Sequence, residues 1–451
     1  MSRVSEGNGI WLLGGLLIIP FILFGLGTIQ AAILLGAVIF ILYFCILILN
    51  FEAGFLALIF IRSSLDSIKN FTASGGVIIG AVSIALIVLG VFYVLYSKVN
   101  ILKFEDSGPF LIFLMFCGVS IVYSPVPNES LSDWLRLLSV FSVYILTRII
   151  FVTPEKILRL FTAILISSLL PVLAAYFQLV TGHGTILDGG QHRIVGTFLH
   201  PNPFATYLMI LLVFLSAQIL EGTRFISQGV KIALAGALFV IFVFTFSRGA
   251  WIAFAFSMAV LGFLRYRKIL GFMPVILIVS FLMIPAVKDR IVNIFQPGYT
   301  HGRSGWDWRL DTWTEVRAMV AKKPLLGHGL SAVEAEFGVL THNDYLRLAA
   351  EIGMLGLLSY LILSYAVLHK TLKDYQNTGS DLSKSFQAAL FAVAAGLLVR
   401  EFADNTLRDT ICMMYFWIFI AISRNMARVD LEQINSLRIN STGGEKLCSV
   451  K

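Results

Sequence analysis

The sequence predicts an all-α protein: a polytopic bundle of about 12 to 14 transmembrane helices, with one long extracytoplasmic loop that contains short helices. Of its 451 residues, 58% are hydrophobic and only 13% are charged, whereas a soluble domain carries roughly 25% charged residues. The mean hydropathy is +0.86, and the apolar residues gather in runs long enough to cross a hydrocarbon core. This composition excludes a soluble enzyme, a disordered protein and a nucleic-acid-binding protein.

Fourteen apolar runs are candidates for the spans. The third run is short, so it is either a tilted span or a re-entrant segment. The first two runs are together too long for a secretory signal and predict the first two spans. The runs are 10–28, 31–49, 52–63, 76–96, 108–124, 134–152, 157–180, 203–220, 229–246, 250–265, 269–287, 346–369, 386–400 and 410–424.

These runs divide the chain into five parts. Residues 1–180 form an N-terminal transmembrane bundle, and residues 181–287 form further transmembrane helices with arginine motifs at their outer face. Residues 288–345 form the extracytoplasmic loop, 346–425 the C-terminal transmembrane helices, and 426–451 a cytoplasmic tail.

The basic residues predict the orientation of the bundle. With both termini in the cytoplasm, the inner segments carry 19 Lys and Arg, the short outer segments carry 7, and the long outer loop carries 8. Cytoplasmic loops are enriched in Lys and Arg, and long loops count less. We therefore expect a multi-pass protein of the cytoplasmic (inner) membrane whose outer face looks onto the periplasm or the extracellular side. The net charge of +8 is then mostly an orientation signal, and no nucleic-acid partner is expected.

Two short outer segments each contain an arginine beside long apolar runs. The segment 182–203 contains Arg193 among glycines and histidines, and the tight turn 246–250 contains Arg248. An arginine at the edge of a bilayer either extends its head group to the interface or holds a partner or ligand. Both interpretations stay open for both residues.

The sequence of the long loop predicts an amphipathic helix and contains a candidate general base. Leu310, Trp313, Val316 and Val320 recur every three or four residues, which indicates a helix at the membrane surface. After a break at 324–329, His342 precedes the next span directly, so it lies at the mouth of the bundle. A single histidine is either structural or, beside several arginines and with no other obvious base, a general base.

Motifs for other chemistry are absent from the sequence. It contains no H-E-x-x-H, no Walker-type loop and no G-x-S-x-G. His192, His200 and Asp188 match no metal-ligand spacing, and the four cysteines show no disulfide or metal pattern. We therefore predict no metal and no cofactor.

Five strings together resemble the bacterial O-antigen ligase and O-antigen polymerase superfamily, over roughly residues 180–425. Each string alone is weak, but the His-Asn string before the Glu-x-Gly helix, after a long outer loop, is fairly specific. The strings are Arg193-x-x-Gly196-Thr197-Phe198-x-His200-Pro201-Asn202-Pro203, Ser247-Arg248-Gly249-Ala250-Trp251, Pro324-Leu-Leu-Gly327-x-Gly329, His342-Asn343-Asp344-Tyr345-Leu346 and Glu351-x-Gly353-x-Leu355-Gly356.

The resemblance implies a glycan transfer at the outer face of the membrane. Members take a glycan from polyprenyl (undecaprenyl) diphosphate and join it to an acceptor hydroxyl, with inversion and without a metal. The expected partners are this lipid-linked donor, a glycan or lipid acceptor, the lipid bilayer and other polysaccharide-export proteins.

The resemblance also assigns roles to residues of this chain. His342 matches the family's catalytic histidine, and Arg193 and Arg248 are the candidates for binding the diphosphate, because guanidinium groups bind phosphate bidentately. Further candidates are Arg309 and Asn343 for substrate binding, and Asp344 or Glu351 as carboxylates that orient His342.

Alternatives to a ligase remain open. A polymerase of O-antigen, capsule or exopolysaccharide repeat units differs only in its acceptor, which is another lipid-linked glycan. A polysaccharide or lipid transporter or flippase would place its ionisable residues near the midplane and often contains internal repeats. Here the charges gather at one face, and no repeat is evident. A peptidoglycan polymerase of the shape, elongation and division type is less favoured, because its motifs are absent.

Overall fold

The computed structural model of the protein describes residues 50–64, 75–188, 191–223, 225–271, 288 and 307–448. The predicted spans 10–28 and 31–49, and nearly all of 269–287, lie outside the described residues. The described elements are, in chain order, α3 (Phe51–Arg62), α5 (Gly75–Ser97), η2 (Ile101–Lys103), α6 (Ser107–Ser120), η3 (Ile121–Tyr123), α7 (Pro127–Ile150), α8 (Pro154–Ser167), α9 (Leu169–Thr181), β1 (Ile186–Asp188), β2 (Gln191–Arg193), α10 (Pro201–Glu221), α11 (Gln228–Phe244), α12 (Arg248–Leu264), α15 (Asp307–Lys322), α16 (Ala332–Phe337), α17 (Asp344–Glu351), α18 (Gly353–Asn377), α19 (Asp381–Arg400), η4 (Thr406–Arg408) and α20 (Thr410–Cys448).

Long apolar helices dominate the described residues. Six helical stretches are long and apolar enough to cross a membrane: 80–97 of α5, α8 with α9, α10, α18, α19 and 410–432 of α20. The apolar helices α11, α12 and 107–123 are shorter. Strands β1 and β2 pair as a small antiparallel ribbon, with Leu187 opposite His192. The predicted class, an all-α polytopic bundle in a membrane, is confirmed.

The centre of the bundle is formed by α10, α19 and α20. Helix α19 packs against α10, α12, α18 and α20, and α20 packs against α7. The side chains of these central helices are mostly buried, for example Phe214 and Phe419, whose rings stack at 3.9 Å between centroids. By contrast, α5 exposes Val88, Phe92 and Leu95. Large apolar side chains exposed along a whole helix are stable against lipid rather than water.

A buried ion network ties α6, α18 and α20 together at one end of the bundle. The guanidinium of Arg424 binds both carboxylate oxygens of Asp106, at 3.0 and 3.1 Å, and one oxygen of Asp374 at 3.2 Å. Asp374 lies 21 residues after Gly353, the first residue of α18, which is about 32 Å along the helix axis. This network therefore lies roughly one hydrocarbon thickness away from the polar residues around Gly353.

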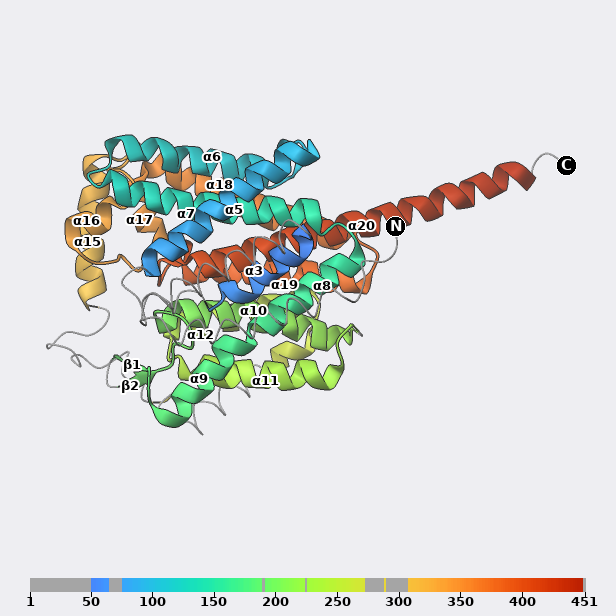
Figure 1. The fold of residues 1–451 in the computed structure, drawn as a ribbon, viewed down its shortest axis with the longest axis horizontal. Coiled ribbons are helices and arrows are strands. Elements are labelled where there is room, and N and C mark those ends of the chain that lie inside the picture. Colours follow the sequence, from blue (N-terminus) through green and yellow to red (C-terminus); the bar gives the residue numbers. More distant parts are fainter. Residues whose placement is uncertain are drawn as a thin grey trace, which may run out of the picture. The chain divides into compact units, whose positions relative to one another are not determined.

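The described part of the predicted outer loop contains two helices, α15 and α16, and leads into α17. Val316 and Met319 of α15 are buried against Val333 and Ala350, while Leu310 is exposed. The apolar face that the sequence assigned to the membrane surface thus packs in part on α16 and α17. Figure 1 shows α15, α16 and α17 at the same end of the bundle as β1 and β2; this end is called the site end below.

Candidate active site

His342 lies between α16 and α17, at the mouth of the bundle. Its Nδ1 atom is 3.0 Å from Oδ1 of Asp404, and its backbone N–H donates to Oδ1 of Asn405 at 2.8 Å. The Trp308 ring meets the imidazole edge to face, with 5.4 Å between centroids. The backbone of His342 has φ +48°, a left-handed conformation that non-glycine residues rarely adopt and that marks a constrained position.

Asp404 connects His342 to a buried arginine. Asp404 lies in the turn after α19 and forms an ion pair with Arg400, the last residue of that helix. Burial alone would raise the pKa of Asp404, but the Arg400 guanidinium and the His342 ring lower this pKa well below its ordinary value. Asp404 is therefore an anion at neutral pH, and it accepts a hydrogen bond from the imidazole.

Arg400 reaches across to the turn that precedes α12. Its NH2 group lies 3.3 Å from Oγ of Ser247, and its Nε lies 3.3 Å from Oγ1 of Thr206. Gly249 provides the space, because a Cβ atom added there would lie only 2.3 Å from NH1 of Arg400. The Ser-Arg-Gly string of this turn thus accommodates a guanidinium from another helix.

The network ends at Arg193. Ser247 donates to Oδ1 of Asn202 at 3.0 Å, and the NH2 group of Arg193 donates to the same oxygen at 2.8 Å. The Nε of Arg193 donates to the backbone oxygen of Thr245 at 2.8 Å. Arg193 is only 3% exposed. A continuous chain of polar contacts therefore runs from His342 through Asp404, Arg400, Ser247 and Asn202 to Arg193.

The other predicted arginines lie at the same end of the bundle. Arg248 is the first residue of α12, directly after Ser247, and is partly exposed. Arg309, on α15, donates to the backbone oxygen of Ala403 at 3.3 Å, next to Asp404. Arg193, Arg248 and Arg309 thus all lie at the site end, and their roles in binding substrate stay predictions.

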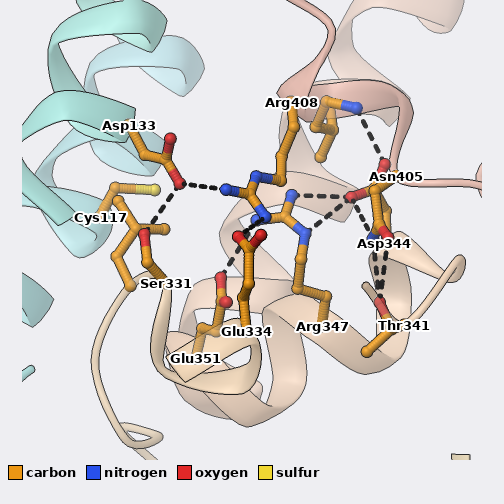
Figure 2. Close-up of polar contacts among 12 residues, drawn as sticks. Cys117, Asp133, Ser331, Glu334, Thr341, Asp344, Arg347, Glu351, Asn405 and Arg408 are labelled. Carbon is orange, nitrogen blue, oxygen red and sulfur yellow. Dashed lines mark hydrogen bonds and ion pairs between the residues drawn. The ribbon is translucent and has the colours of Figure 1, made fainter. Parts of the chain in front are cut away.

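The predicted orienting carboxylates contact an arginine rather than His342. Asp344 accepts from Arg347 at 2.7 and 3.0 Å, and Glu351 accepts from the same guanidinium at 3.1 Å. Asp344 also receives the backbone N–H of Leu407 at 2.9 Å, which fixes the start of η4. Figure 2 shows this cluster, with Arg347 between the two carboxylates. The carboxylate that contacts His342 is Asp404.

Asn343, predicted to bind substrate, caps a helix. Its Oδ1 accepts the backbone N–H of Leu346 at 3.0 Å, and its side chain is nearly buried. An asparagine in this place satisfies an amide at the first turn of α17. Asn343 therefore holds the first turn of the helix that directly follows His342.

The Pro-Leu-Leu-Gly string holds the loop against the junction of α17 and α18. The N–H of Gly329 donates to the backbone oxygen of Glu351 at 2.8 Å, and that of Met354 donates to the backbone oxygen of Pro324, also at 2.8 Å. Gly353 has φ +72°, and a Cβ atom there would lie 2.1 Å from the backbone oxygen of Leu325. This string and the Glu-x-Gly string thus form one structural joint beside the candidate site.

Arg400 and Asp404 were missed as site residues by the sequence reasoning. Arg400 was counted only among the seven basic residues of the short outer segments, which indicate orientation. The available signal was the presence of Arg400, Glu401 and Asp404 at the end of an apolar span, because ionisable residues at such a position usually have a partner.

Comparison with known proteins adds an independent observation. A family model described as O-antigen ligase matches residues 233–361, from α11 to the first turns of α18. The matched segment contains Arg248, Arg309 and His342. This match supports the resemblance to the O-antigen ligase superfamily over residues 233–361. Together with the six apolar helices, the match supports an integral membrane protein with a function of the O-antigen ligase and polymerase type. No match was found among curated proteins.

Proposed function

We propose that this protein transfers a glycan from polyprenyl diphosphate to an acceptor hydroxyl at the outer face of the cytoplasmic membrane. The single observation that carries the proposal is the polar chain from His342 to Arg193. It connects a histidine paired with a buried carboxylate to a buried guanidinium.

The arrangement suits His342 as the general base. Because the ionised Asp404 accepts from Nδ1, the neutral imidazole carries its proton on that atom and its lone pair on Nε2. Nε2 can then take the proton of the acceptor hydroxyl. Asp404 acts through His342, so it is a positioning residue. The left-handed backbone of His342 and its hydrogen bond to Asn405 hold the ring in place.

In the proposed step the acceptor oxygen attacks the anomeric carbon as its proton passes to Nε2 of His342. The bond between that carbon and the diphosphate oxygen breaks, and polyprenyl diphosphate leaves with the electron pair. One displacement inverts the configuration at the anomeric carbon. Arg193 and Arg248 would offset the negative charge that develops on the leaving group, since fixed cations stabilise such charge in a site shielded from water.

The proposed orientation puts the site at the outer face of the cytoplasmic membrane. The inner segments carry 19 of the basic residues and the short outer segments only 7, which favours cytoplasmic termini. Arg193 then follows the outer end of α9, Arg400 lies at the outer end of α19, and His342 lies just before α17, which leads into the outer end of α18. The donor's diphosphate would be reached there from the outer leaflet.

Reconstitution tests this function. The purified protein in proteoliposomes receives a polyprenyl-diphosphate glycan and candidate acceptors. We expect polyprenyl diphosphate to be released in equal amounts with the newly glycosylated acceptor. Growth in chain length without an added acceptor identifies a polymerase, and a single transfer to an added acceptor identifies a ligase. Movement of intact donor across the bilayer, without cleavage, would instead identify a transporter.

A further inference from the structure

We propose that a polar pocket at the site end, between α7, α16 and η4, binds the carbohydrate acceptor. The pocket has a volume of about 220 Å³. Its polar lining comes from three carboxylates, two guanidinium groups and two hydroxyl groups: Glu129, Asp133, Glu334, Arg136, Arg408, Ser132 and Ser331. This inference rests on the proposed function, because it assigns the second substrate of the same reaction.

The charges of the pocket alternate along its wall. Asp133 accepts from Arg136 at 2.5 Å and from the hydroxyl of Ser331 at 2.8 Å. Arg408 lies 3.4 Å from Asp133 and donates to Glu334 at 2.5 Å. Figure 2 shows Arg408 reaching between Asp133 and Glu334. Acceptors and donors are therefore fixed side by side before any ligand arrives.

This chemistry fits sugar hydroxyls better than a phosphate. A hydroxyl donates one hydrogen bond and accepts others, so it needs both carboxylate oxygens and guanidinium N–H groups nearby. Three carboxylates against two guanidinium groups leave the lining with a formal charge of −1, which repels a diphosphate. The other end of the polar chain instead carries the guanidinium group of Arg193. The two substrates are thus separated by electrostatics.

A single turn connects the pocket to the candidate base. Asp404, which contacts His342, and Arg408, which lines the pocket, are four residues apart, so their Cα atoms are at most about 14 Å apart. Between them, Asn405 accepts the N–H of His342 and donates to Thr341. A glycan seated in the pocket would therefore extend a hydroxyl toward His342.

The test fills the pocket without changing its ion pairs. Ala335 is exposed and lines the pocket, while its neighbour Glu336 is exposed on the same helix and does not line it. Ala335→Trp is the test variant and Glu336→Trp is the matched control. Both are assayed in proteoliposomes for the KM of acceptor and of donor. Both are also assayed for binding by saturation-transfer NMR, with two probes: oligosaccharide released by mild acid from the lipid-linked donor, and oligosaccharide cleaved from the finished surface glycolipid.

We expect Ala335→Trp to raise the acceptor KM about tenfold or more, with the donor KM unchanged, because only acceptor binding is obstructed. One of the two oligosaccharides should bind the wild type and the Glu336→Trp variant but not Ala335→Trp. Binding of the oligosaccharide released from the lipid-linked donor indicates a polymerase acceptor. Binding of the oligosaccharide cleaved from the surface glycolipid indicates a ligase acceptor. An unchanged acceptor KM, or equal oligosaccharide binding by all three proteins, would overturn the proposal.

The two proposals fail in different ways. If the wild type transfers no glycan, the proposed function fails, and the NMR measurement still decides whether the pocket binds carbohydrate. If the wild type transfers glycan and Ala335→Trp behaves as the wild type does, the proposed function stands and the pocket assignment is wrong.

Discussion

The imidazole Nδ1 of His342 lies 3.0 Å from the carboxylate of Asp404, although 62 residues separate them along the chain. Asp404 is in turn paired with Arg400. The candidate base is thus attached to the end of α19, one of the central helices. Its position depends on the packing of the bundle as much as on its own loop.

Asp404→Asn removes the charge and keeps the shape of the side chain. The amide can turn its N–H₂ group toward Nδ1, which would select the imidazole tautomer that has no lone pair on Nε2. We expect glycan transfer to slow by about 10²-fold or more, the usual contribution of a general base, with the donor KM unchanged. Steady-state kinetics in proteoliposomes measure this, and a full rate in the variant would exclude Asp404 as a positioning residue.

Gly249→Ala tests the space given to Arg400. A Cβ atom would lie 2.3 Å from NH1 of Arg400, so the guanidinium must move away from Ser247 and Asp404. We expect transfer to fall by about 10²-fold, since small displacements of reacting groups have effects of this size. Gly236→Ala on α11 is the control, because no atom lies within 4 Å of the added carbon. Equal rates in the two variants would contradict this account.

Arg193→Lys tests the diphosphate site while keeping the charge. Lysine loses the paired N–H groups of a guanidinium, and a hydrogen bond to a charged group contributes about 1.5–3 kcal/mol. We expect the donor kcat/KM to fall about 10- to 100-fold. Arg428→Lys, at an exposed ion pair with Glu432, should leave it unchanged. An unaltered donor kcat/KM in Arg193→Lys would show that Arg193 does not bind the donor.

Glu401→Gln should alter how stability depends on pH. Burial, reinforced by Asp344, raises the pKa of Glu401 to about 8, so the folded protein holds a proton that the unfolded chain loses near pH 4.5. Stability contributed by this group is therefore full at low pH and declines as pH rises toward 8. The glutamine variant keeps an acceptor for the Tyr360 hydroxyl. It should raise the unfolding temperature in detergent more at pH 8 than at pH 5, and a pH-independent difference would refute this assignment.

Labelling tests the orientation. In a protein with Cys45 and Cys448 replaced by serine, Glu336→Cys should react with a membrane-impermeant maleimide in intact cells. Lys373→Cys, exposed near the far end of α18, should react only after permeabilisation. The opposite pattern would place the site end in the cytoplasm and would rule out the proposed outer-face reaction.

The fold class could be predicted from the sequence because the features that indicate a transmembrane helix are local. Apolar runs and the scarcity of charge are properties of single segments, and they identified the helices now seen as α10, α18, α19 and α20. The break of one predicted span into α8 and α9 at Ser168 was not predicted. The apolar run continues through the break, and Pro171 marks it, since proline is tolerated in the first turn of a new helix.

The site was predicted only in part because its contacts join distant segments. The candidates His342, Arg193 and Arg248 came from turns beside apolar runs, and all three lie at the site end. The partner of His342 could not be inferred, because proximity in sequence favoured Asp344, which instead binds Arg347. Asp404 reaches the imidazole because the start of α17 is bonded to the end of α19, through Tyr345 to Leu398 and Asp344 to Glu401.

The most direct test of the central claim is the rate of glycan transfer from polyprenyl diphosphate by His342→Gln in proteoliposomes, with His369→Gln as the matched control. His369 stacks on Tyr365 in the C-terminal half of α18. The account predicts that transfer by His342→Gln falls at least about 10²-fold while the protein still inserts and binds the donor, and that His369→Gln matches the wild type. Transfer by His342→Gln at the wild-type rate would contradict the account.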